Sequence, residues 1–135
     1  MASGTFATVI NCMDGRTQLP LINWIKERYG VDYVDTITEP GPDRILSAGH
    51  PDDIVGSIKG RLLISVQKHA SEQVVLVAHG DCAGNPVTKD EHLGMLRKGM
   101  ELLRRWDLPV DIVGVWVDEI NWEVEVIAEI NRPKH

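Results

Sequence analysis

The sequence predicts a single α/β domain built on a mainly parallel β-sheet. Short apolar segments typical of buried strands alternate along the chain with longer amphipathic segments typical of helices. The length of 135 residues and the apolar fraction of 43% suit one hydrophobic core. We therefore expect residues 1–135 to form one domain, with helices on both faces of a five-stranded sheet ordered 2-1-3-4-5.

The first half of the chain supplies two of these strands and one helix. Residues Thr5–Asn11 are short, apolar and rich in β-formers, which predicts a buried strand. Thr17 can cap a helix near residues 19–29, and Gly30 is a typical stop. Residues 31–38 alternate as a second strand does.

The middle of the chain begins with a segment rich in turn formers. Residues Glu39–Asp52 contain three prolines and two glycines, so we expect a loop, and its length makes it a candidate binding loop. A helix starting at Asp52 or Asp53 then carries an apolar stripe as far as Ala70. Residues 73–78 are the most apolar run of the chain, which is typical of a central parallel strand.

The last third of the chain completes the sheet. Thr88 can cap a helix that runs to about Trp106. Residues 110–117 and 122–130 read as strands, and their connection is too short for a crossover. The fifth strand should therefore pair antiparallel with the fourth.

Charge and composition exclude several classes of partner. Against 14 Lys and Arg stand 20 Asp and Glu, a net charge of −6, so we expect neither nucleic acid nor a membrane as partner. The longest uncharged stretch has 13 residues, too few to span a bilayer, and no basic residue precedes it as in a signal peptide. We expect a cytoplasmic protein whose two cysteines are reduced thiols.

Potential metal ligands follow two of the predicted strands. Cys12-Met13-Asp14-Gly15-Arg16 comes after the first strand, and His79-Gly80-Asp81-Cys82 after the third. Ligand sites of open α/β sheets form at the carboxyl ends of the strands. Two thiolates and one imidazole suit Zn²⁺, and three protein ligands leave a fourth position for water, Asp14 or a small anion.

Simpler interpretations of the same residues stay open at this stage. Each cysteine alone could be a small buried hydrophobic residue, and Cys12 and Cys82 could form a reversible disulfide. Asp14 and Arg16 could be an ordinary surface ion pair. The spacing from Cys12 to Arg16 is too short for a phosphatase-like anion loop.

Taken together, the motifs Cys-x-Asp-x-Arg and His-x-x-Cys resemble the signature of the β-class carbonic anhydrases. Ser47-Ala48-Gly49 is similar to the Asn-Ala-Gly loop of that family, and Val113-Gly114-Val115-Trp116 resembles its penultimate strand. The resemblance covers most of residues 6–130.

The resemblance implies a zinc lyase that hydrates carbon dioxide reversibly to bicarbonate. Cys12, His79 and Cys82 would be the zinc ligands, and Asp14 and Arg16 the catalytic dyad. In some members of the family, the Asp instead takes the fourth zinc position. Hydrolysis of carbonyl sulfide or carbon disulfide, or a non-catalytic zinc-binding or sensory module, are the alternatives.

Several positions depart from the family pattern. Gly15 replaces a Ser, and Leu46-Ser47 replaces Arg-Asn, so contacts to an anion would be missing or supplied by Arg44. Ala83 stands where the family has Gly, and Gly84 follows one residue later. We expect Gly49, Ala83 and Gly84 to contact substrate.

The resemblance also implies a homodimer or a higher homo-oligomer. Family members build each active cleft against a partner subunit, and the last two strands with Trp116 and Trp122 offer apolar surface for one. His92, near the start of the third long helix, would be of interest if that helix faces the cleft.

Overall fold

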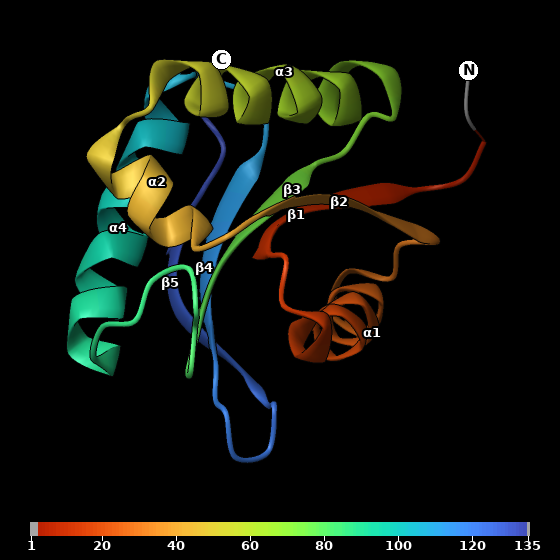
Figure 1. Ribbon diagram of the computed structural model, residues 1–135. Coiled ribbons are helices and arrows are strands. Elements are labelled where there is room, and N and C mark those ends of the chain that lie inside the picture. The colour runs from red at the N-terminus through yellow and green to blue at the C-terminus, as the bar shows by residue number, and fades with distance from the viewer. Residues whose placement is uncertain (1–2, 135) are drawn as a thin grey trace.

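The computed structural model describes residues 3–134 and has three layers, with a sheet between helices (Figure 1). Helices cover both faces of the sheet (Figure 1). In chain order the elements are β1 (Phe6–Cys12), the short 3₁₀ helix η1 (Gly15–Thr17), α1 (Gln18–Tyr29), β2 (Tyr33–Glu39), α2 (Pro42–Ala48), α3 (Asp52–Lys68), β3 (Gln73–His79), α4 (Lys89–Arg105), β4 (Asp111–Val117) and β5 (Val124–Ile130).

The sheet has the order β2-β1-β3-β4-β5, which confirms the predicted topology. The pairs β1·β2, β1·β3 and β3·β4 are parallel, and β4·β5 is antiparallel with an irregularity between Gly114 and Val115. Strand β1 therefore lies between β2 and β3, although β3 follows it only after three helices and β2 in the chain. The order of the strands reverses at β1, where open α/β sheets place their ligands.

Alternating side chains of the strands build two hydrophobic cores. Along β3, Val74 and Leu76 face α2, α3 and α4, whereas Val75 and Val77 face α1. All four side chains are fully buried, because helices cover both faces of the strand. This burial explains why residues 73–78 form the most apolar run of the sequence.

The predicted loop over residues 39–52 is wrong, because residues Pro42–Ala48 form α2. Pro42 stands in the first turn of α2, where its fixed φ favours a helix and its missing N–H costs nothing. Gly41 and Gly49 flank the helix in left-handed conformations, with φ of 66° and 72°. Ile45 and Leu46 are buried in the core on the side of α3 and α4, so tertiary packing stabilises this two-turn helix.

Two helix starts were predicted from capping residues, with different outcomes. Thr88 caps α4 in a reciprocal capping box with Glu91, as its position indicated. Thr17 precedes α1, but its side chain makes no capping bond and instead donates to the carbonyl oxygen of Asp14. The remaining strand and helix ends differ from the predicted ends by one or two residues.

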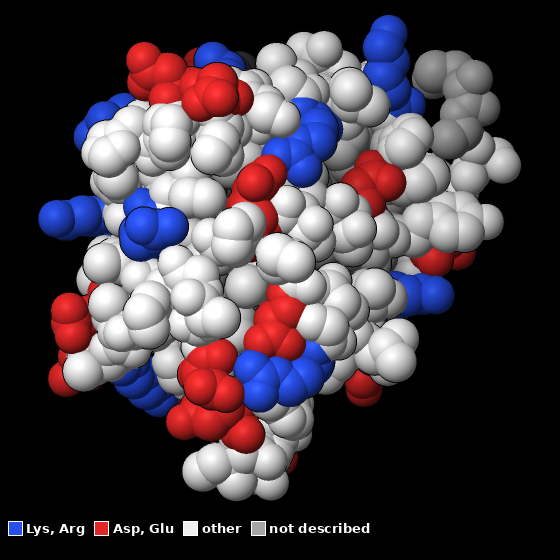
Figure 2. Space-filling view, in the orientation of Figure 1, with Lys and Arg blue, Asp and Glu red and all other residues white. Residues whose placement is uncertain are grey.

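Acidic and basic side chains alternate over the face of the molecule in Figure 2, and no extended basic area appears on that face. This distribution agrees with the net charge of −6. None of the helices in residues 3–134 is long and apolar enough to cross a membrane.

The loop after β3 passes in direct contact with the loop before α2. A Cβ atom at Gly84 would lie 2.5 Å from the carbonyl carbon of Pro40 and 2.7 Å from the nitrogen of Gly41. Both are backbone atoms, so no side-chain rotation can relieve the overlap. Glycine at position 84 is therefore required by the packing of two loops.

We expect Gly84→Ala to lower the free energy of unfolding by about 1–3 kcal/mol, since the two loops must separate. Gly94 is the matched control, because it lies exposed within α4 and a Cβ there meets nothing within 4 Å. Gly94→Ala should raise the free energy of unfolding by about 0.5–1 kcal/mol through helix propensity. Urea unfolding of both variants measures the difference, and equal effects would contradict this packing.

Candidate metal centre

Three potential metal ligands meet at the carboxyl ends of β1 and β3. Cys12 ends β1, His79 ends β3, and Cys82 lies in the loop after β3. Their donor atoms all lie within 4.8 Å of one another, and all three residues are buried. The β1·β3 pairing stops at Ile10↔Leu76, so the last residues of both strands are available to the site. The juxtaposition expected from the sequence is therefore confirmed.

The turn after β1 is held by side chains that the sequence analysis did not single out. Buried Asn11 accepts a hydrogen bond from the backbone N–H of Cys12 and donates to the hydroxyl of Thr17, at 2.8 and 3.0 Å. Gln18 donates to the carbonyl oxygens of Cys12 and Asp14, both at 2.9 Å. Asn11, a polar residue near the end of a mostly apolar strand, was the feature of the sequence that could have indicated this role.

The ring of His79 is oriented by the backbone of the next residue. Its Nδ1 lies 2.7 Å from the carbonyl oxygen of Gly80, which can only accept, so Nδ1 carries the hydrogen. The Nε2 atom is buried and has no hydrogen-bond partner among residues 3–134. A lone pair on Nε2 therefore faces the two cysteines, in the arrangement that metal-binding histidines have.

The two cysteine sulfurs are hydrogen-bonded to each other, and this contact shifts the pKa of both. Their Sγ atoms lie 3.8 Å apart and are not joined in a disulfide. The hydrogen bond from the Cys82 thiol lowers the pKa of Cys12 to about 3, against the effect of burial and with help from His79 and the Gly41 amide. The same contact with the Cys12 thiolate, together with burial, raises the pKa of Cys82.

The electrostatics of His79 follow from these thiols. Burial by itself would lower the pKa of the imidazole, but Cys12 and the Gly80 carbonyl outweigh burial and raise it.

These three donors fit a zinc ion. Two sulfur ligands on a tetrahedral ion, each about 2.3 Å from the metal, are about 3.8 Å apart, which is the separation of Cys12 Sγ and Cys82 Sγ. The Nε2 atom of His79, buried and without a partner, is the third donor. A set of two thiolates and one imidazole suits Zn²⁺ and leaves one coordination position open.

Asp14 is held by Arg16 and does not join the three donors. The guanidinium donates to both carboxylate oxygens, with Arg16 Nη2 2.7 Å from Oδ2 and Nε 3.0 Å from Oδ1, and the Arg16 backbone N–H adds a third donor at 2.9 Å. These hydrogen bonds lower the pKa of Asp14 to about 2 and raise the pKa of Arg16. Asp14 and Arg16 thus form an ion pair that begins two residues after Cys12 in the chain.

Two further residues hold Arg16, and sequence reasoning missed both. Arg16 Nη1 donates to the Asp81 carboxylate at 3.1 Å, and Nη2 donates to the Asp81 carbonyl oxygen at 3.2 Å. The guanidinium carbon also lies 4.8 Å from the ring centroid of Trp122. Asp81 lies within the His-Gly-Asp-Cys motif, which was a usable signal. Trp122 reaches the site from the β4–β5 connection, and no local pattern could indicate that.

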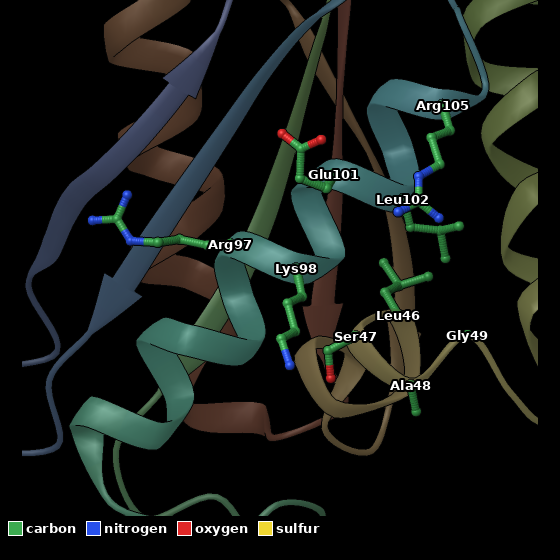
Figure 3. Close-up of a pocket in the computed structure, with 9 residues that line it drawn as sticks. All are labelled: Leu46, Ser47, Ala48, Gly49, Arg97, Lys98, Glu101, Leu102 and Arg105. Carbon is green, nitrogen blue, oxygen red and sulfur yellow. The ribbon is translucent and has the colours of Figure 1, made fainter.

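The predicted substrate contacts are not brought together. Ala83 is exposed beside Cys82, and Gly84 packs against Pro40 and Gly41. Gly49 ends α2 and lines a hollow of about 470 Å³ between α2 and α4, whose lining includes none of the three donors (Figure 3). Arg44 lines a different hollow of about 410 Å³, beside Glu39.

The charged side chains that line the hollow between α2 and α4 do not converge on one point. Figure 3 shows Lys98 directed toward α2, while Arg97 extends away from it toward the strands. Glu101 and Arg105 also line the hollow, so both signs of charge are present. The chemistry of the molecule is therefore concentrated at the three buried donors rather than in this hollow.

Comparisons with known proteins agree with the fold and the motifs. A family model described as "Putative carbonic anhydrase" matches residues 2–128. Solved structures of similar fold include a β-carbonic anhydrase of Trichomonas vaginalis, with 18% identity, a TM-score of 0.60, and coverage of 93% of this chain and 83% of that one. A carbonic anhydrase of Streptococcus mutans has 19% identity, a TM-score of 0.59, and coverage of 90% and 81%.

A third similar structure is one of two tetrameric β-carbonic anhydrases of Sordaria macrospora. It has 12% identity and a TM-score of 0.65, and the match covers 96% of this chain and 84% of that one. At these identities the three structures establish a shared fold. No curated protein matches the chain significantly.

The ion pair beside the donors generates a prediction about protonation. We expect Arg16→Gln to raise the pKa of Asp14 from about 2 toward the ordinary value of about 3.9, because the guanidinium no longer stabilises the carboxylate. In the wild type, stability from this pair is present above about pH 4 and lost as the pH falls through about 2; the variant lacks it. NMR titration of the Asp14 carboxyl measures the shift.

Asp81→Asn is the matched control, since it removes a carboxylate from Arg16 but leaves the bonds between Arg16 and Asp14. This control should change the pKa of Asp14 much less than Arg16→Gln does. A carboxyl that still titrates near 2 in Arg16→Gln would show that Arg16 is not the cause.

Proposed function

This chain belongs to the β-carbonic anhydrase family, and on that premise we propose that it catalyses the reversible hydration of carbon dioxide to bicarbonate with one zinc ion per chain. The zinc would be held by Cys12, His79 and Cys82. The observation that supports this proposal most strongly is the set of three buried donors, with sulfurs 3.8 Å apart and a histidine nitrogen that has no partner in the described chain.

Zinc bound to these donors would act as a Lewis acid that lowers the pKa of a water molecule, so that hydroxide is available near neutral pH. The reaction combines carbon dioxide and water and yields bicarbonate and one proton. The chain must therefore orient the attacking oxygen, keep nearby charges fixed and let a proton leave.

Asp14 is suited to orient the attacking water. Its side chain is largely shielded, with 17% exposed, and the low pKa keeps it an ionised acceptor at any working pH. A carboxylate that can only accept must receive the hydrogen of the attacking O–H group, which turns the oxygen lone pair toward the carbon of carbon dioxide. A protonated Asp14 would lose this preference.

Arg16 is suited to hold Asp14 in place rather than to react. It donates to both carboxylate oxygens of Asp14 and is itself fixed by Asp81 and by the face of Trp122. These contacts keep the carboxylate from turning toward the metal position. Gly15 between them has open space around its Cα, so the departure from Ser removes no packing contact here.

We expect Asp14→Asn and Arg16→Ala each to reduce the rate of carbon dioxide hydration by about 10²-fold or more, with one zinc per chain retained, since neither residue holds the metal. Stopped-flow hydration assays, together with elemental analysis of the same samples, provide the measurement. Asp111→Asn is the matched control, because it breaks an Asp–Arg pair with Arg132 at the opposite end of the sheet and should leave the rate unchanged.

Three outcomes would contradict the proposal. Zinc-loaded wild type without hydratase activity would favour a non-catalytic zinc module. Hydrolysis of carbonyl sulfide or carbon disulfide in place of hydration would move the assignment to those linear substrates. Metal-free protein with a Cys12–Cys82 disulfide would favour a redox role.

We also propose that the protein is a homodimer or a higher homo-oligomer. Trp116 is only 5% exposed and belongs to the core, and Trp122 packs partly buried beside Arg16, so neither tryptophan offers a free apolar face, although the apolar side chains of β5 are partly exposed. Strongly exposed apolar side chains next to the site residues in the chain are Met13 at 64% and Leu19 at 68%, and we place the interface there.

Light scattering should give at least twice the chain mass of 15.0 kDa at micromolar concentration. Leu19→Lys should weaken this association by placing charge in the covered surface, whereas Glu101→Lys, a charge change in the hollow between α2 and α4, should not. A monomeric wild type would contradict the proposal.

A further inference from the structure

A second cluster of polar residues lies buried behind the three donors and has no part in the proposed reaction. Asp43 in α2, Asn85 in the loop after β3, and His92 in α4 are each 1% exposed. His92 Nδ1 donates to Asp43 Oδ2 at 2.6 Å, and Asn85 Nδ2 donates to the same oxygen at 3.2 Å. One carboxylate oxygen therefore joins two helices and a loop.

The cluster lies where the loop after β3, which carries Cys82, meets the loop before α2. Besides the contact of Gly84 with Pro40 and Gly41, a Cβ at Gly41 would lie 2.9 Å from the Cβ of Asn85. Gly41 is two residues before Asp43, and Gly84 directly precedes Asn85. The polar cluster and the glycine contacts therefore fasten the same pair of loops together.

Both loops connect directly to the cysteines. The backbone N–H of Asn85 donates to the carbonyl oxygen of Cys82 at 3.3 Å, and the loop before α2 follows Glu39, the β2 residue that pairs with Cys12. Contacts outside the ligands themselves orient the ligands of a metal site. The positions of the two cysteines therefore depend on how these loops are held.

We propose that Asp43, Asn85 and His92 form a positioning clasp, which holds the loop that carries Cys82 against the loop before α2; this rests on the proposed zinc site. The clasp touches neither substrate nor metal. It acts through the loop backbones, so its loss should alter zinc affinity and loop mobility before it alters the fold.

The chemistry of the cluster favours positioning over simple packing. A buried carboxylate is costly unless it is paired, and apolar residues of similar size would often serve stability as well or better. Apolar side chains, however, could not accept a hydrogen bond from the Asn85 side-chain amide, so they could not fix the direction of the loop that carries Asn85. The ring of His92 packs against Trp116 at 5.4 Å between centroids, which sets the orientation of Nδ1 toward Asp43.

The test compares zinc affinity and local amide exchange in matched variants. His92→Phe removes the donor to Asp43 but keeps a ring, His92→Gln restores an N–H donor, and Asn85→Ala removes only the loop's link to the helix pair. Thr8→Val is the control, because it breaks a buried hydroxyl network that Thr8 forms with Ser65 and Ser71, four residues before Cys12 along β1.

We expect His92→Phe and Asn85→Ala to weaken zinc binding by about 10–100-fold in chelator competition, and to speed hydrogen exchange at the amides of residues 41, 43 and 82–85. His92→Gln should recover part of both effects. Thr8→Val should lower the unfolding temperature without either effect.

Zinc affinity and loop exchange that change no more in the clasp variants than in Thr8→Val would overturn the proposal. Asn85→Ala keeps the Asp43–His92 pair between α2 and α4, so it decides the matter if His92→Phe does not fold. Wild type that binds zinc but lacks hydratase activity would refute the proposed function and leave the clasp intact. Wild type that binds no zinc would refute the metal centre, and exchange would still test the clasp.

Discussion

The adjacency of β1 and β3 is the constraint on which the chemistry of this protein depends. Parallel pairing brings the carboxyl ends of two strands, 67 residues apart in the chain, to one edge of the sheet. Because the pairing ends before Cys12 and His79, their side chains can turn toward each other and toward Cys82. A different strand order would leave two ordinary buried thiols and a buried histidine.

The negative charges at this edge of the sheet, on Cys12 and Asp14, are stabilised by hydrogen-bond donors from nearby groups and from one arginine. The Cys12 thiolate is stabilised by a neighbouring thiol, by His79 and by amides, so its pKa falls despite burial. Asp14 is kept ionised by Arg16, which remains partly exposed, with 48% of its side chain accessible. The Asp14 carboxylate is thus mostly shielded from water, while the Arg16 guanidinium that neutralises it keeps part of its hydration.

The short helix α2 connects the packing of the core with the geometry of the site. On one side, Ile45 and Leu46 pack into the core formed with α3 and α4. At the other, Gly41 and Asp43 approach the loop after β3 and contact it through backbone and carboxylate. The helix and the glycine before it therefore both anchor the core and align the loop after β3.

The sequence by itself determined the class of fold, the strand order and the identity of the potential metal ligands. Periodicity, capping at Thr88 and the apolar run at 73–78 are local features, and strand crossovers have one preferred hand, so these could be derived from spacing alone. Cys12, His79 and Cys82 follow strands directly, and their position in the chain therefore indicated their position in space.

Only the tertiary structure decided the surroundings of those donors. Residues 39–52 carry prolines and glycines typical of a loop, yet residues 42–48 within them form a helix because the core covers two of their apolar side chains. Trp122 reaches Arg16 from a connection more than one hundred residues away, and Asp43 meets His92 across two helices. Such contacts depend on long-range packing, which leaves no periodic trace in the sequence.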